Sequence, residues 1–159
     1  MKSKLLVGIG IGAGFGILCI VGIIILEFYI VRLEQQLKYV NIQVDAPSNV
    51  VLDDEFVIEI QIENTSDEIY ILKDIDVHPD YLEGIFISGS EPQFHNTFSG
   101  EVTGYQNYKF DQNIHPKSEL VVQLHAIGFE TGSFIGDIDI CINALGACRG
   151  FPLRTVVSD

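Results

Sequence analysis

Hydrophobic residues follow three successive patterns along the chain. The first is a continuous apolar run over residues 5–26, LLVGIGIGAGFGILCIVGIIIL, without a charged residue. As an α-helix these residues rise roughly 33 Å, enough to cross the hydrocarbon core of a bilayer. The run ends in Glu27-Phe28-Tyr29 and lacks the small-residue pattern of a signal-peptide cleavage site. We therefore expect an uncleaved signal anchor, with residues 1–4 as a short tail and residues 5–26 as a single transmembrane helix.

The second pattern is a short helical repeat directly after the apolar run. Ile30, Leu33, Leu37 and Val40 recur at three- and four-residue steps, with polar side chains between them. This spacing gathers apolar side chains on one face of a helix. It predicts a juxtamembrane helical stalk over residues 27–38, which is too short to indicate a coiled coil.

From residue 39 onward the apolar positions recur at every second residue, the period of a half-buried β-strand. The pattern is clearest at 56–63, where Phe56, Ile58, Ile60 and Ile62 alternate with polar residues. Similar segments predict strands at 39–45, 56–63, 69–77, 84–88, 105–110, 119–126, 133–142 and 150–157. Short strands separated by turn residues predict an all-β fold, an antiparallel Ig-like β-sandwich of seven to eight strands over residues 39–159. Residues 89–104 form the longest irregular stretch, and such a loop is either functional or mobile.

Three segments of this region resemble a known group of proteins. Residues 46–66, APSNVVLDDEFVIEIQIENTS, look like the opening of bacterial and archaeal surface Ig-like modules. Residues 114–124 and 132–141 are similar to the final strands of the same modules. The resemblance covers about residues 39–158 and is to the CARDB-like and related Ig-like superfamily. It implies a β-sandwich fold and carries no catalytic or ligand-binding residues with it.

Charge is distributed unevenly and restricts the partners of the β-rich region. The residues after Lys38 include 20 Asp and Glu against 5 Lys and Arg, a formal charge of −15. Such a surface repels nucleic acid and anionic lipid headgroups, so we expect no nucleic-acid binding. Lys2 and Lys4 precede the apolar run, which favours a cytoplasmic N-terminus under the positive-inside rule. The expected location is the cell membrane, with the β-domain outside the cytoplasm.

The cysteines support the same location. Cys141 and Cys148 bracket a short segment, a spacing that suits a disulfide across a hairpin. A pair of free thiols is the alternative. Disulfides persist in oxidising compartments, so this bond would place the domain outside the cytoplasm. Cys19 lies within the apolar run, where we expect it only to pack.

Glycines in the apolar run indicate a possible contact between helices. Gly8, Gly12 and Gly16 lie at four-residue steps, so they share one helix face. Small residues at this spacing let two membrane helices approach closely. They predict self-association or a helical partner within the membrane, although glycine is also common in membrane helices.

Alternating acidic residues suggest two interpretations of the strand surface. Asp74 and Asp76, with His78 and Asp80 beyond them, are expected along one strand face, and Asp137 and Asp139 form a second pair. Carboxylates from adjacent strands could hold calcium. Alternating acids are also typical of a solvated strand face, and neither segment has the glycine-containing loop of a calcium motif. The sequence therefore favours the solvated face, with no metal and no cofactor.

No catalytic motif is present. The four histidines, His78, His95, His115 and His125, are scattered, and no nucleophile elbow, zinc-protease or P-loop pattern occurs. Asn64-Thr65-Ser66 is either a glycosylation sequon or a plain turn. We expect a non-catalytic, membrane-anchored extracytoplasmic module that acts by protein–protein interaction or in envelope assembly. The alternative is a pilin-like filament subunit whose N-terminal helix packs in the filament core.

Overall fold

The computed structural model describes residues 37–100, 104–143 and 147–159. All of them belong to one compact unit, which spans residues 36–159. The predicted tail, the transmembrane helix with Gly8, Gly12 and Gly16, and residues 27–36 of the stalk lie outside the described residues. In the part that is described, no helix is long and apolar enough to cross a membrane.

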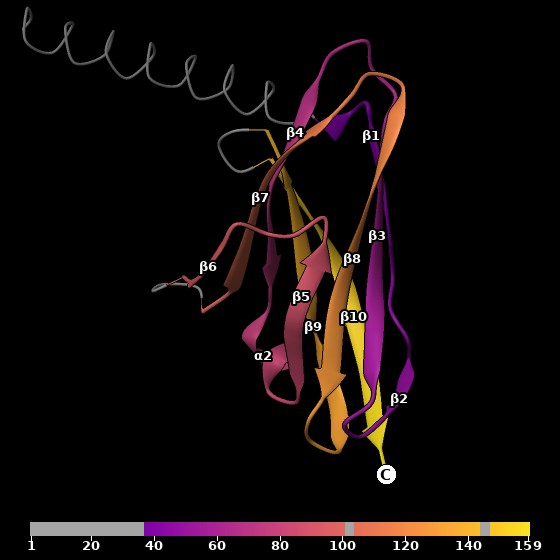
Figure 1. Ribbon diagram of the computed structural model, residues 1–159, viewed down its shortest axis with the longest axis vertical. Helices are drawn as coiled ribbons and strands as arrows, with labels where there is room; N and C mark the ends of the chain where they lie inside the picture. The colour runs from indigo at the N-terminus through magenta and orange to yellow at the C-terminus, as the bar shows by residue number, and fades with distance from the viewer. Residues whose placement is uncertain (1–36, 101–103, 144–146) are drawn as a thin grey trace, which may run out of the picture. The chain divides into compact units, whose positions relative to one another are not determined.

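The described residues form ten strands and one short helix arranged around two sheets (Figure 1). The four-stranded sheet has the order β1-β3-β8-β5, and the six-stranded sheet has the order β2-β10-β9-β4-β7-β6. The elements are β1 (Val40–Asp45), β2 (Asn49–Val51), β3 (Glu55–Asn64), β4 (Tyr70–Val77), α2 (Pro79–Leu82), β5 (Ile85–Glu91), β6 (Asn96–Ser99), β7 (Gln106–Ile114), β8 (Ser118–Gly128), β9 (Gly132–Ile142) and β10 (Cys148–Ser158).

Alternation along the strands builds the core between the two sheets. On β3, Ile58, Ile60 and Ile62 are fully buried, and the register sets Ile60 opposite Val122 of β8. The six-stranded sheet contributes Leu72, Ile75, Ile138 and Ile140 to the same core. Burial of one such side chain stabilises the fold by about 1.5–3 kcal/mol, so these alternating segments determine which face of each strand points inward.

The predicted sandwich is correct in outline and wrong in three details. β2 and β6 were not expected, so the described part has ten strands instead of seven to eight. The sheets are also not purely antiparallel, because β2 pairs with β10 in parallel, with Asn49 opposite Val156. Residues 89–104, expected to be an irregular loop, contain the end of β5 and the whole of β6.

A one-turn helix interrupts the strand pattern after β4. Pro79 starts α2, and His78 caps it by accepting the N–H of Asp80 at Nδ1, 3.2 Å away. The backbone of His78 is still extended, and its N–H donates to the carbonyl of Asp137 on β9, so this residue caps the helix directly at the end of β4. The helix packs on Gly136 of β9, where an added Cβ would lie 2.9 Å from the Cβ of Tyr81.

Asn64 joins two turns at one end of the sandwich. Its side chain is fully buried, and its Nδ2 donates to the carbonyl oxygens of Glu68, Ile114 and His115 at 2.7, 3.1 and 3.1 Å. Its Oδ1 accepts the backbone N–H and the hydroxyl of Ser66. The amide is thus a structural link between the β3–β4 and β7–β8 turns, and in the folded domain it is not a surface acceptor for a glycan.

Candidate functional site

An acidic cluster lies on the outward face of the six-stranded sheet. Along β4, Ile75 and Val77 point into the core, whereas Asp74 and Asp76 point outward. The register sets Asp76 between Asn107 of β7 and Asp139 of β9. Directly opposite residues on one sheet face have Cβ atoms about 4.5–5.5 Å apart. We call Asp74, Asp76 and Asp139 the acidic cluster.

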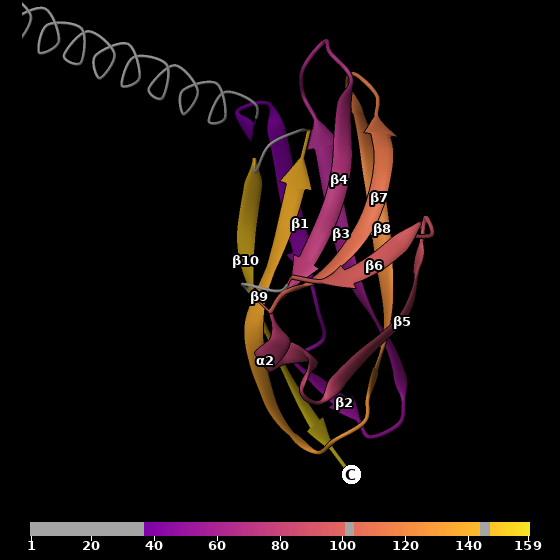
Figure 2. The ribbon, with the colours of Figure 1, turned by 90° about the vertical axis from the view of Figure 1, so that its left-hand side faces the viewer.

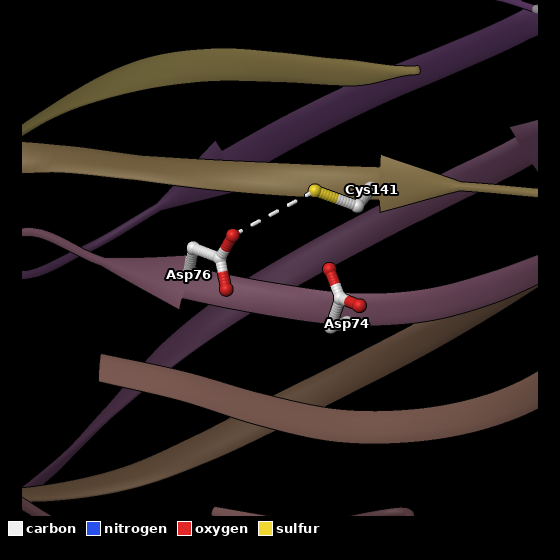
Figure 3. Close-up of side chains that lie close together, drawn as sticks. All are labelled: Asp74, Asp76 and Cys141. Atoms are coloured by element: carbon white, nitrogen blue, oxygen red, sulfur yellow. Dashed lines mark hydrogen bonds between the residues drawn. The ribbon is translucent and has the colours of Figure 1, made fainter. Parts of the chain in front are cut away.

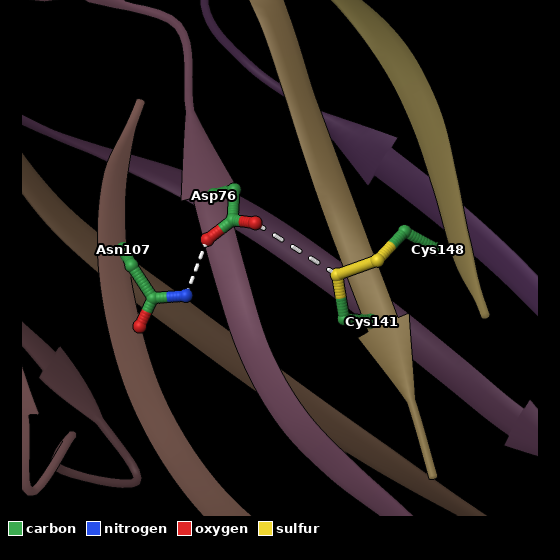
Figure 4. The surroundings of a disulfide bond; sticks show 4 residues. All are labelled: Asp76, Asn107, Cys141 and Cys148. Carbon is green, nitrogen blue, oxygen red and sulfur yellow. Dashed lines mark hydrogen bonds between the residues drawn. A yellow bond between two sulfur atoms is a disulfide. The ribbon is translucent and has the colours of Figure 1, made fainter. Parts of the chain in front are cut away.

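Asn107 is the buried polar neighbour of this cluster. Only 7% of the residue is exposed, and its Nδ2 donates to Oδ1 of Asp76 at 2.5 Å. Figure 4 shows the amide nitrogen directed toward Asp76 and the amide oxygen directed away from it. That oxygen, Oδ1, is buried and accepts no hydrogen bond from any residue that the structure describes. A buried polar atom without a partner is uncommon, because leaving it unpaired costs about 1–3 kcal/mol.

Burial makes the charged form of the cluster unfavourable. It raises the pKa of Asp74, Asp76 and Asp139 above the usual value for an aspartate, and in each case it is the largest cause. The pKa of Asp76 is raised further by the charges of Asp74 and Asp139, although the hydrogen bond from Asn107 opposes this. The effect of burial on the pKa of Asp74 is opposed by a hydrogen bond from Asn107 and by the charges of Lys109 and Lys73.

The nearest lysines are engaged by a different aspartate. Nζ of Lys73 lies 2.7 Å from Oδ1 of Asp111, and Nζ of Lys109 lies 3.6 Å from its Oδ2. The hydrogen bond from Lys73 is the main reason that the pKa of Asp111 is lowered. Among residues 37–100, 104–143 and 147–159, no Lys or Arg forms an ion pair with a member of the acidic cluster.

A disulfide borders the acidic cluster. Cys141 and Cys148 face each other across β9 and β10 and form the predicted bond, with a Cα–Cα distance of 4.0 Å. Sγ of Cys141 lies 3.9 Å from Oδ2 of Asp76, the contact dashed in Figure 3. A disulfide sulfur carries no proton, so this contact is not a hydrogen bond.

The structure brings together only part of the predicted acidic set. Asp74 and Asp76 lie close together on β4, and Asp139 is opposite Asp76 on the same sheet face, as the two alternating segments allowed. Asp137, two residues before Asp139 on β9, is exposed and lies opposite Pro152 of β10. His78 and Asp80 belong to the cap of α2. Asn107 was missed because only the register of β7 on β4 reveals that it faces Asp76.

A second surface feature is the open edge of the same sheet. β6 is the outermost strand, all four of its residues are exposed, and Figure 2 shows it at the margin of the sheet. The N–H of Gly100, just after β6, donates to the carbonyl of Tyr105, just before β7. Hydrogen-bonded and non-hydrogen-bonded pairs alternate along an antiparallel ladder, so Phe98 forms the next hydrogen-bonded pair, with Asn107. The backbone groups of Thr97 and Ser99 then face outward. Phe98 is 52% exposed and shares the outward face with Asn107.

No family model matches the chain, and no curated protein matches it either. Among solved structures, it is similar to a family 123 glycoside hydrolase from Clostridium perfringens, with 9% identity over 76% of this chain and 27% of that chain and a TM-score of 0.48. A cohesin module from a family 33 glycoside hydrolase of Clostridium perfringens ATCC13124 has 12% identity over 76% and 98%, with a TM-score of 0.43. Escherichia coli α2-macroglobulin has 15% identity over 76% and 7%, with a TM-score of 0.44. At TM-scores below 0.5, these similarities carry no argument about function.

Proposed function

We propose that the chain is a membrane-anchored, extracytoplasmic Ig-like module, of the type found on bacterial and archaeal surfaces, and that it acts by protein–protein contact and not by catalysis. The single observation that carries the proposal is the open edge of β6, where an exposed strand and an exposed aromatic ring occur together. The anchor in this proposal is the uncharged run of residues 5–26.

Two properties support a location outside the cytoplasm. The Cys141–Cys148 bond belongs to an oxidising compartment, because cytosolic thiols are kept reduced. The formal charge of −15 on the residues after Lys38 keeps such a domain soluble and away from anionic headgroups. The stripe of Gly8, Gly12 and Gly16 adds a second contact, with another membrane helix or a second copy of the chain.

The β6 edge supports one mode of contact, the addition of a strand from a partner. The outward backbone groups of Thr97 and Ser99 offer a partner strand its hydrogen bonds, and Phe98 offers apolar surface beside them. In the free domain the side chain of Asn96 occupies part of this edge, because its Oδ1 accepts the N–H of Thr97 at 2.9 Å. A partner strand would displace that side chain.

Site-specific cross-linking in intact cells tests this contact. A photo-reactive phenylalanine analogue replaces Phe98 in the full chain, and in a control it replaces Val121, which is exposed on the other sheet. We expect a discrete cross-linked adduct from position 98 and none from position 121. Adding Thr97→Pro should reduce the adduct roughly tenfold, since proline removes an outward N–H worth about one hydrogen bond.

Proline is tolerated at this position of an edge strand, so Thr97→Pro should leave the melting temperature of the domain nearly unchanged. Equal adducts from positions 98 and 121 would contradict docking at β6. So would an adduct at position 98 that Thr97→Pro leaves intact in a chain that still melts normally.

A further inference from the structure

An exposed apolar patch lies on the outward face of the four-stranded sheet, at the margin formed by β5 (Figure 1). Phe86 of β5 is 58% exposed, and the register sets it directly opposite Ile127 of β8. Val57 of β3 follows diagonally on the same face, and the exposed ring of Phe129 lies at the end of β8, two residues beyond Ile127. We call Val57, Phe86 and Ile127 the apolar patch. Exposed apolar side chains gathered in this way mark contact surfaces, in which aromatic residues are enriched.

A pocket of about 500 Å³ opens beside the apolar patch. It is lined by Glu55, His125, Phe94 and the bulged segment of β5 around Gly89. Glu55 lies opposite Ile127, so the pocket and the patch share one row of the sheet. Nδ1 of His125 is 3.5 Å from Oε1 of Glu55, and a Cβ added at Gly89 would meet no atom within 4 Å. The pocket is therefore open to an entering side chain and presents a carboxylate to it.

The charge of this sheet is acidic along every strand. Within their bounds, β1, β3, β8 and β5 contain no Lys or Arg and six carboxylates, Asp45, Glu55, Glu59, Glu63, Glu91 and Glu119. The register places Glu63 directly opposite Glu119 and aligns Glu59 with Asp45, pairs of like charge that are destabilising. A basic partner would relieve this repulsion, whereas a second copy of so acidic a domain would increase it. Charge complementarity thus selects a basic occupant for this face.

We propose that this face binds a segment of a partner protein in which apolar side chains alternate with lysine or arginine. An apolar side chain of the segment packs on Phe86 and Ile127, and a neighbouring cation enters the pocket and pairs with Glu55. The surface belongs to the other sheet from the β6 edge, so the inference goes beyond the proposed function and does not rest on it. With both surfaces occupied, one chain joins two partners.

Binding of a defined peptide to the full chain in nanodiscs of zwitterionic lipid tests this surface. The probe is a fluorescent peptide of alternating lysine and leucine, and its counterpart carries glutamate in place of lysine. Nanodiscs without the protein correct for binding to lipid, and fluorescence anisotropy gives the affinities. We expect the basic peptide to bind at least about tenfold more tightly than the acidic one. Equal affinities for the two peptides would overturn the proposal.

Two matched pairs of variants locate the bound peptide. Phe86→Ser should weaken binding of the basic peptide about tenfold, because it removes apolar surface that binding would bury. Val121→Ser, roughly 20 Å farther along the same face, should change the affinity less than about twofold. Glu55→Gln should weaken binding about threefold, whereas Glu119→Gln should not. If the members of either pair weaken binding equally, the peptide is attracted diffusely to an acidic domain, and the proposal fails.

Photo-cross-linking in intact cells tests the natural occupant. A photo-reactive phenylalanine analogue at position 86 of the full chain should give a discrete adduct that Glu55→Gln weakens. Thr97→Pro should leave this adduct unchanged, so failure of docking at β6 and failure at this face are distinguishable. An adduct with twice the mass of the chain would identify a second copy and overturn the proposal. The absence of an adduct, or one that Glu55→Gln leaves intact, would overturn it as well.

Discussion

Replacing Asn64 with alanine is expected to lower the free energy of unfolding by about 2–4 kcal/mol. The side chain donates to three carbonyl oxygens and accepts from Ser66, and all of these contacts are lost together. The carbonyls of Glu68, Ile114 and His115 would lose a donor that holds the β3–β4 and β7–β8 turns together. Urea unfolding of the full chain, followed by tyrosine fluorescence, measures the change.

Asn49→Ala provides the matched control for this prediction. Asn49 lies exposed on β2, and in the described part of the chain its side chain hydrogen-bonds only the hydroxyl of Ser48. The same change of residue type should therefore cost less than about 0.5 kcal/mol there. If the two variants lose similar amounts of unfolding free energy, the buried hydrogen bonds of Asn64 do not stabilise the fold. A glycan found on Asn64 of the native protein would contradict its burial directly.

Removing the disulfide should have the second largest effect. Cys141 and Cys148 are seven residues apart, and closing so short a loop in the unfolded chain is worth roughly 2 kcal/mol. The double variant Cys141→Ala/Cys148→Ala should unfold at correspondingly lower urea. A reducing agent should not change the unfolding midpoint of this double variant. It should lower the midpoint of the unmodified chain toward that of the variant.

Cys19→Ala is the control for the cysteine variants, because Cys19 lies outside the β-unit. It should unfold like the unmodified chain and keep its response to reduction. If reduction leaves the unfolding curve of the unmodified chain unchanged, the cross-strand bond contributes no stability.

Alternation made the long strands predictable. Ile58, Ile60 and Ile62 repeat with period two because one face of β3 contacts the core and the other meets water. The short strands carry no such signal. β2 has only three residues and β6 is exposed at every position, so both exist through pairing with β10 and β7. Pairing between distant segments is not encoded in local periodicity, and this also concealed the parallel partner of β2.

The candidate site was predictable to the same extent. Asp74 and Asp76 fall on one outward face by alternation alone, and the spacing of Cys141 and Cys148 indicated the hairpin bond. Asn107 could not be found in this way, because its approach to Asp76 depends on the register of β7. Between the pairs Leu72–Gln112 and Asp74–Lys109, β7 has one residue more than β4, and this bulge shifts the register by one residue. No pattern in the sequence marks the bulge.

Labelling of Cys148 in intact cells tests the central claim, that the β-unit lies outside the cytoplasm with its disulfide formed. Cys148 is the exposed member of the pair, and Cys141 is buried. Cells that carry the full chain with Cys19→Ala are treated with a membrane-impermeant maleimide, before and after mild reduction. We expect labelling only after reduction. If the chain stays unlabelled in intact cells under both conditions, yet is labelled after lysis, the domain is cytoplasmic, and both the location and the proposed function are contradicted.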